Sequence, residues 1–123
     1  MSCPFCELPN ERIVLQNLSA TAFFDGYPVT EGHSLVIPKR HVADYWGLTE
    51  IERADCHALL QEMREEITRK DPSVTGFNLG TNAGASAGQT VFHCHFHLIP
   101  RRDGDVERPR GGIRHVIPGK GFY

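Results

Sequence analysis

The chain lacks any long hydrophobic run. None of its 123 residues belongs to a stretch approaching the roughly 20 apolar residues that a transmembrane helix requires. The first residues, Met-Ser-Cys-Pro-Phe-Cys, also lack the basic segment followed by an apolar segment that is typical of a secretory signal peptide. These two absences exclude a membrane-spanning protein and lead us to expect a cytoplasmic one.

A strong charge of either sign is also missing. The 13 Lys and Arg residues nearly balance the 15 Asp and Glu residues, which leaves a formal net charge of -2. Such a balance excludes a global electrostatic attraction to nucleic acid or to a membrane surface, so any anion site must be local. We therefore expect no nucleic acid and no membrane as partners, whereas a small phosphate ligand remains compatible with the composition.

Cysteine is too infrequent for a disulfide-rich scaffold, with four residues in the chain. In a reducing compartment these are thiols or metal ligands rather than disulfides. Cys56 and Cys94 lie in apolar patterns, which indicates buried thiols. Nothing in the cysteine content predicts a disulfide framework.

The other two cysteines form Cys3-Pro-Phe-Cys6, which fits a redox pair, half of a metal site or two unrelated thiols. A redox pair usually follows a strand and opens a helix, and residue three has no such context. Tetrahedral zinc needs about two ligands beyond two thiolates. His41 and His93 are the candidates for them.

Apolar periodicity predicts one long helix from Thr49 to Lys70, with a capping box at Thr49 and Glu52 and an end at Asp71-Pro72. Short apolar runs bounded by turn residues predict strands. Because strands and helix are segregated along the chain, we expect an α+β fold with an antiparallel sheet. Residues 1–102 then form one domain, and residues 103–123 form an irregular tail packed on it or on a partner. The predicted strands are residues 13–15, 21–24, 34–37, 76–80 and 91–99.

The last predicted strand carries three of the seven histidines at alternate positions, His93, His95 and His97. Alternate side chains of a strand share one face. One possibility is a catalytic zinc held by all three imidazoles, but positions i and i+2 lie roughly 7 Å apart. A second is that the middle imidazole attacks phosphorus, with the loop Gly88-Gln89-Thr90 supplying donors to a phosphate. A third is that the histidines are structural.

The segment H-C-H-F-H-L-I resembles the motif of the histidine triad family. The blocks Phe24-Asp25, His33 to His41, and Asn82 with Gly88-Gln89-Thr90 are similar to the other family blocks, in the same order. The resemblance implies a five-stranded antiparallel sheet with one principal helix. It also implies a homodimer with a continuous ten-stranded sheet.

By the same resemblance the activity is hydrolysis or transfer at the α-phosphate of a purine nucleotide substrate, through a nucleotidyl-histidine intermediate. His95 would be the nucleophile. His97 and Thr90 would donate hydrogen bonds to the phosphate and the leaving group, and His33 would complete the histidine cluster.

The resemblance also assigns the nucleotide-binding residues. Gly88 and Gln89 would hold phosphate oxygens together with Thr90, and Asn82 would contact the nucleotide beside them. Asp25 would bind the ribose hydroxyls, although an aspartate at this point can equally cap the turn that follows.

Zinc-containing branches of the family have four ligand positions, and this sequence has a cysteine or histidine at each of them. The resemblance therefore implies a structural zinc at Cys3, Cys6, His41 and His93. The continuation from Ile99 to Arg102 is similar to dinucleoside polyphosphate hydrolases, with diadenosine tetraphosphate as an example of a substrate. The alternatives are a nucleoside phosphoramidase or nucleotidyltransferase with the same site, a non-catalytic nucleotide-binding protein, and a hydrolase with catalytic zinc on the triad.

Overall fold

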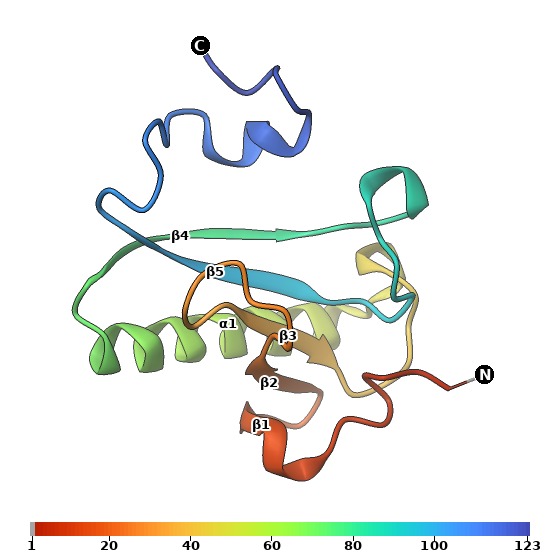
Figure 1. The fold of residues 1–123 in the computed structure, drawn as a ribbon. Coiled ribbons are helices and arrows are strands. Elements are labelled where there is room, and N and C mark those ends of the chain that lie inside the picture. Colours follow the sequence, from red (N-terminus) through yellow and green to blue (C-terminus); the bar gives the residue numbers. More distant parts are fainter. Residues whose placement is uncertain (1) are drawn as a thin grey trace.

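The structure is a computed structural model that describes residues 2–123. Its sheet has five strands in the order β1-β2-β3-β5-β4, and every neighbouring pair is antiparallel. The single long helix, α1, lies along one face of this sheet (Figure 1). This arrangement confirms the predicted α+β fold. The bounds are β1 Ile13–Gln16, β2 Ala20–Phe24, β3 Ser34–Pro38, α1 Glu50–Lys70, β4 Val74–Thr81 and β5 Phe96–Arg102.

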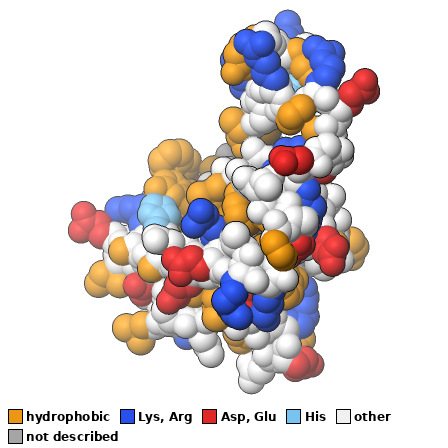
Figure 2. Space-filling view, turned by 90° about the vertical axis from the view of Figure 1, so that its left-hand side faces the viewer, with side chains coloured by type: hydrophobic (Ala, Val, Ile, Leu, Met, Phe, Trp, Pro, Cys, Tyr) orange, Lys and Arg blue, Asp and Glu red, His pale blue; other side chains and the backbone are white. Residues whose placement is uncertain are grey.

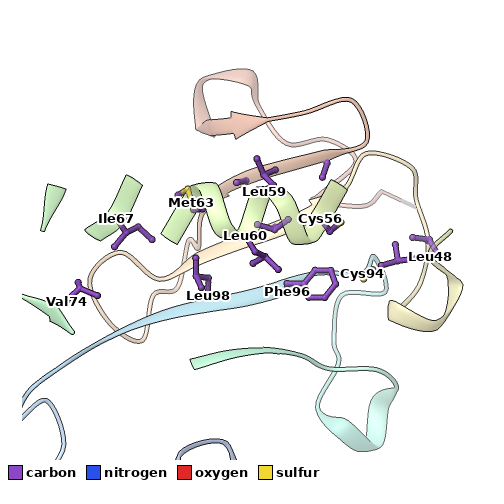
Figure 3. Packing of buried hydrophobic residues seen from close by; sticks show 14 residues of the cluster. Leu48, Cys56, Leu59, Leu60, Met63, Ile67, Val74, Cys94, Phe96 and Leu98 are labelled. Carbon is purple, nitrogen blue, oxygen red and sulfur yellow. The ribbon is translucent and has the colours of Figure 1, made fainter. Parts of the chain in front are cut away.

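Helix α1 begins and ends where the sequence predicts. The Thr49 hydroxyl accepts from the Glu52 amide, while the Glu52 carboxylate accepts from the Thr49 amide, so the capping box is complete. The apolar stripe of the helix packs against the sheet and forms the core (Figure 3). Its buried apolar residues are Cys56, Leu59, Leu60, Met63 and Ile67.

The register of the sheet decides which side chains face the helix. Val36 pairs with both Ala22 and Phe96, and all three belong to the core cluster under α1. Directly paired residues in antiparallel strands share a face. Leu35, one residue earlier, pairs with His97, so His97 lies on the face opposite the helix.

That opposite face has a small apolar cluster of its own. Phe23, Leu35 and Ile37 are buried there, and Phe5 and Leu8 from the N-terminal segment pack over them. The N-terminal segment therefore covers part of the face that carries His97.

The last strand differs from the prediction at its start. It was expected from residue 91, but β5 begins at Phe96, and the β3–β5 ladder stops at the Val36–Phe96 pair. The physical reason lies in Pro38, which has no N–H to donate and whose carbonyl accepts from the His93 ring at 2.8 Å. The Cys94 amide pairs instead with the Val42 carbonyl, at 2.7 Å.

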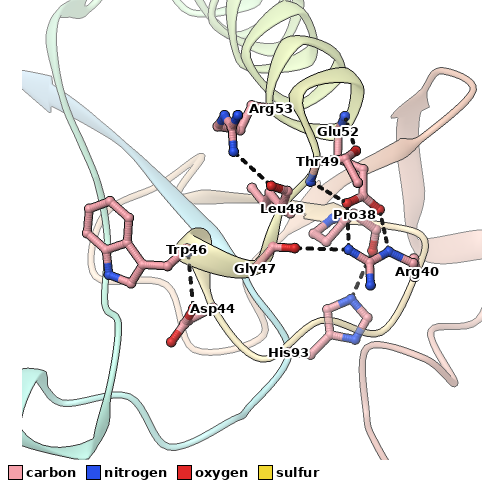
Figure 4. A network of polar contacts seen from close by, with 10 residues as sticks. All are labelled: Pro38, Arg40, Asp44, Trp46, Gly47, Leu48, Thr49, Glu52, Arg53 and His93. Atoms are coloured by element: carbon pink, nitrogen blue, oxygen red, sulfur yellow. Dashed lines mark hydrogen bonds and ion pairs between the residues drawn. The ribbon is translucent and has the colours of Figure 1, made fainter.

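The segment between β3 and α1 is fastened by one buried carboxylate. Glu52 accepts from Arg40 through both oxygens, at 2.8 and 2.9 Å, and Arg40 also donates to the Gly47 carbonyl (Figure 4). These bonds to Arg40, with those from Thr49, lower the pKa of Glu52 to about 2. The network holds the segment that carries His41 against the start of the helix.

The tail beyond β5 contains one short 3-10 helix, Gly112–Val116, which contacts β4. At the start of the tail, Arg101 donates hydrogen bonds to both carboxylate oxygens of Asp105. The Arg108 guanidinium lies 4.0 Å from the centre of the Phe122 ring. The tail forms the lobe beyond β4 in Figure 1, and Lys and Arg side chains gather on this lobe in Figure 2.

Within residues 2–123 no helix has the length and the apolar character needed to cross a membrane.

Candidate functional site

Two cysteines and two histidines from three distant segments meet beside the start of β5. The Sγ atoms of Cys3 and Cys6 each lie 3.5 Å from His93 Nδ1, and the Cys6 Sγ lies 3.2 Å from His41 Nδ1. One ligand atom from each of the four residues lies within 4.8 Å of the others. A turn, closed by the bond from the Glu7 amide to the Cys3 carbonyl, presents both sulfurs on the same side.

The hydrogen bonds of His93 fit it to metal ligation. A carbonyl can only accept, so the bond to Pro38 requires that His93 Nε2 carry the proton. The neutral ring then has its lone pair on Nδ1, which faces the two sulfurs. Burial lowers the pKa of His93 and thereby favours this neutral form. Two thiolates and two imidazoles with a buried carbonyl behind one ring are a set that suits tetrahedral zinc.

A second cluster joins Asp25, His33 and His97. The His33 Nδ1 accepts from the Val29 amide at 3.1 Å, so His33 must carry its proton on Nε2. That Nε2 lies 3.0 Å from His97 Nδ1 and 3.4 Å from a carboxylate oxygen of Asp25. His97 therefore accepts on Nδ1 and carries its own proton on Nε2.

The same reasoning argues against a metal ion in this second cluster, although its ligand atoms are close enough for one. The ring nitrogen of His33 that faces His97 and Asp25 carries a proton, and a metal requires a lone pair. Burial, with His95 and His33 nearby, lowers the pKa of His97 to about 4. His97 is thus a neutral donor near pH 7.

The middle imidazole presents a free lone pair. His95 Nδ1 lies 2.8 Å from the carbonyl of His93, which can only accept, so Nδ1 carries the proton and the neutral ring has its lone pair on Nε2. The ring is half-buried. The centres of the His95 and His97 rings lie 5.2 Å apart, so a ring nitrogen with a lone pair lies beside a ring that donates.

The arrangement of the triad does not fit the alternative in which all three histidines bind one catalytic zinc. Within residues 2–123 the sets of converging ligand atoms divide the triad, with His93 in one, His97 in the other and His95 in neither. Each imidazole has its own hydrogen-bond partner: the Pro38 carbonyl for His93, the His93 carbonyl for His95 and the His33 ring for His97. The three rings therefore do not converge on one point.

The loop between β4 and β5 is built from small residues and one buried amide. Gln89 accepts from the Gly84 amide at 2.8 Å and donates to the carbonyls of Ala43 and Val91. Its side chain therefore holds the loop in place and points into the protein. Gly88 has φ of 92°, in the left-handed region that favours glycine.

His97 lines a cavity of about 890 Å³ together with Asn82 and Gly88. His33 also borders it, so four of the predicted site residues meet there. Thr90 is exposed and does not belong to the lining of this cavity. The tail contributes Ile113, Val116 and Ile117 to the same cavity, a contribution that the irregular sequence of the tail did not predict.

Asp25 follows β2 and serves the turn after it. One carboxylate oxygen accepts from the Tyr27 amide at 2.9 Å, and the other lies toward His33. This confirms the turn-capping interpretation, and it leaves the carboxylate beside the histidine cluster.

Sequence reasoning missed Phe5, whose ring lies 5.1 Å from that of His95. The only signal was its place between two cysteines that were themselves predicted to bind zinc. It also missed the Pro38 carbonyl, because no pattern of residue types reports where a main-chain acceptor lies.

Comparison with known proteins gives consistent matches. A hypothetical histidine triad nucleotide-binding protein of Sulfolobus tokodaii superposes with a TM-score of 0.77 at 36% identity, over 84% of this chain and 71% of that one. A zinc-bound histidine triad family protein of Mycobacterium smegmatis gives 0.76 at 36% identity, over 85% and 78%. The adenosine 5'-monophosphoramidase hnt1 of Schizosaccharomyces pombe is 36% identical over 105 residues, which are 82% of this chain and 75% of that protein.

The family model of the HIT domain matches residues 8–104. This range includes the histidine triad, the small-residue loop before it and Asp25 after β2. This chain belongs to the HIT domain family.

Proposed function

We propose that His95 of this protein attacks the α-phosphate of a nucleotide substrate. The result would be hydrolysis of the substrate or transfer of its nucleotidyl group. The observation that carries the proposal is the protonation pattern of the triad. His95 has its proton fixed on Nδ1 by the His93 carbonyl, and His97 has its proton fixed on Nε2 through His33. A free lone pair and a neutral donor side by side are what displacement at phosphorus needs.

In the first step the lone pair of His95 Nε2 forms a bond to phosphorus while the bond between phosphorus and the leaving group breaks. The leaving group keeps the electron pair of that bond and takes up a proton from solvent. The Nε2–H of His97 donates to a phosphate oxygen or to the departing atom. In the second step the oxygen of a water molecule bonds to phosphorus, and the N–P bond breaks with its electron pair returning to His95 Nε2. The surplus proton of the water passes to solvent, and the mononucleotide is released. Asp25 would bind the ribose, and Asn82, Gly88 and Thr90 would support the phosphate. Gln89 would act by holding the loop.

The residues that line the cavity beside His97 indicate which kind of leaving group the site accepts. Of the described residues that line it, none is Lys or Arg, and six are Val, Leu or Ile. A polyphosphate leaving group carries several negative charges, which call for cationic partners. The lining thus supports an uncharged amine more than a second nucleotide. A relative named as an adenosine 5'-monophosphoramidase supports the same choice, so we place phosphoramidates before dinucleoside polyphosphates.

The cluster of Cys3, Cys6, His41 and His93 would hold a structural zinc, since protein ligands fill all four positions. A zinc-bound relative of similar fold and the convergence of the four ligand atoms support this assignment. In that role His93 would not react. It would hold its carbonyl in place for His95.

A second copy of the chain would pair along β4, because β4 is an end strand of the sheet and its outer edge pairs with no other strand of the described residues. A groove of about 620 Å³ between α1 and this strand is bordered by Leu60, Phe77 and Leu79, and Leu79 is 53% exposed. Antiparallel pairing of two such edges gives the expected ten-stranded sheet.

Replacement of the nucleophile tests the proposal. The change His95→Asn keeps a donor for the His93 carbonyl but removes the attacking nitrogen, so turnover of an adenosine phosphoramidate should fall at least about a thousandfold while nucleotide binding persists. Brief exposure of the wild-type protein to substrate should leave a nucleotidyl adduct on the His95 peptide in mass spectrometry. The control His115→Asn lies in the tail and should react normally. Near-wild-type turnover of His95→Asn would refute the assignment, and the absence of any adduct would favour a pure nucleotide-binding protein.

The leaving group is tested by rates on two substrates at matched concentrations. We expect kcat/KM for an adenosine phosphoramidate to exceed that for diadenosine tetraphosphate by at least about tenfold, because the cavity offers no cation to a polyphosphate. Equal rates, or a preference for the tetraphosphate, would contradict the interpretation of the cavity.

Metal analysis tests the zinc site. The wild-type chain should bind about one zinc per chain, and Cys3→Ala should reduce this severalfold because a tetrahedral site loses one of its four ligands. Cys56→Ala, which removes a buried thiol outside the cluster, should retain the metal. Unchanged zinc in Cys3→Ala would exclude the four-ligand site.

Sedimentation velocity tests the pairing of β4. The wild-type chain should sediment as a dimer, and Leu79→Asp should shift it toward the monomer because a charge would be buried at the paired edge. Leu18→Asp, in the exposed turn between β1 and β2, is the matched control. A monomeric wild-type chain at micromolar concentration would overturn the proposal.

A further inference from the structure

We propose that Phe5 is a positioning residue for the His95 imidazole, and that the Cys-x-x-Cys turn couples the metal cluster to the nucleophile through this ring. The inference rests on the proposed function, because it assigns His95 the role of nucleophile. It adds a residue that neither the triad nor the metal cluster includes.

The geometry around Phe5 is the first argument. Its ring stands edge-on to His95, with centres 5.1 Å apart and planes at 75°. It stands edge-on to His93 as well, at 5.9 Å and 80°. Phe5 is the residue from the N-terminal segment that touches both rings, and T-shaped contacts of this kind are favourable and directional.

His95 needs such a neighbour. Within residues 2–123 the His95 ring makes a single hydrogen bond, which joins Nδ1 to the His93 carbonyl. A ring held at one atom can still pivot about that bond. A pivot moves Nε2, the attacking nitrogen, because it lies on the other side of the ring. Phe5 and His97 are the aromatic rings that contact His95 in the described chain, and together they limit this movement.

The position of Phe5 depends in turn on the residues beside it. Cys3 and Cys6 direct their sulfurs toward His93 Nδ1, and the Cys6 amide donates to the Cys3 sulfur at 3.4 Å. On its other side the Phe5 ring lies 5.6 Å from Phe23 on the sheet. A metal ion that binds both cysteines would fix the turn and press this ring between the sheet and His95.

Steady-state kinetics provides the first test. Phe5→Leu keeps apolar bulk against Phe23 but removes the ring, so we expect kcat for an adenosine phosphoramidate to fall about tenfold, with KM within about twofold, because the nucleophile is less well oriented. Phe5→Tyr retains a ring and should recover most of the rate. Leu8→Ala, which packs on the same apolar cluster without contacting His95, should keep kcat within about twofold. An unchanged kcat in Phe5→Leu would overturn the proposal, as would a raised KM alone, which would make Phe5 a substrate contact.

NMR of the histidine rings gives a readout that does not depend on turnover. In the zinc-loaded protein, Phe5→Leu should shift the ring signals of His95 and His93, whereas Leu8→Ala should leave them in place. Removal of the metal with a chelator should shift the His95 signals more in the wild-type chain than in Phe5→Leu, because only the former transmits the change through the ring. Equal shifts in both would show that the coupling does not run through Phe5.

The two sets of measurements separate this inference from the proposed function. If the wild-type chain forms no adduct on His95, the proposed function fails, while the NMR shifts still decide whether Phe5 orients the ring. If the adduct forms at an unchanged rate in Phe5→Leu, the function stands and the positioning role is wrong.

Discussion

The hydrogen bond from the His93 ring to the Pro38 carbonyl is the interaction on which the site depends. It takes the acceptor with which β3 would otherwise continue to pair, so β5 starts only at Phe96. It also fixes the proton on Nε2 and turns the lone pair of His93 toward the cysteines. The main chain of His93, held by that ring, offers the carbonyl that orients His95. One contact thus links the end of the β3–β5 ladder, the cluster of cysteines and histidines proposed to bind zinc, and the imidazole proposed as the nucleophile.

A second chain of hydrogen bonds prepares the donor. It starts at a main-chain amide, Val29, passes through both nitrogens of His33 and ends on His97. Because the first donor is an amide that cannot reverse its role, each later proton has only one place to lie. Burial lowers the pKa of His97 to about 4, so the ring donates without becoming charged. The two sets of hydrogen bonds therefore give the neighbouring rings different tautomers, with the proton on Nδ1 in His95 and on Nε2 in His97. Two imidazoles in water would have no such fixed difference.

Much of this could be predicted from the sequence, and the reason differs from element to element. Helix α1 was predictable because its capping box and its apolar stripe are local patterns. The proposed division of the triad between metal binding and phosphate chemistry came from resemblance to the family rather than from spacing. The start of β5 was predicted wrongly, since a proline and a side chain from distant positions end the ladder. Gln89 looked like a phosphate donor, but its amide faces three main-chain groups.

The sequence by itself determined the helix, the number of strands, the small-residue loop and the presence of a family motif, because all of these are encoded in residues close together in the chain. Only the tertiary structure decided which nitrogen of each imidazole is free, since each answer depends on a carbonyl or amide contributed by another segment. It alone placed Phe5 beside His95, from 90 positions away in the chain, and the tail beside His97. Protonation and orientation are properties of contacts, and contacts between distant segments exist only after folding.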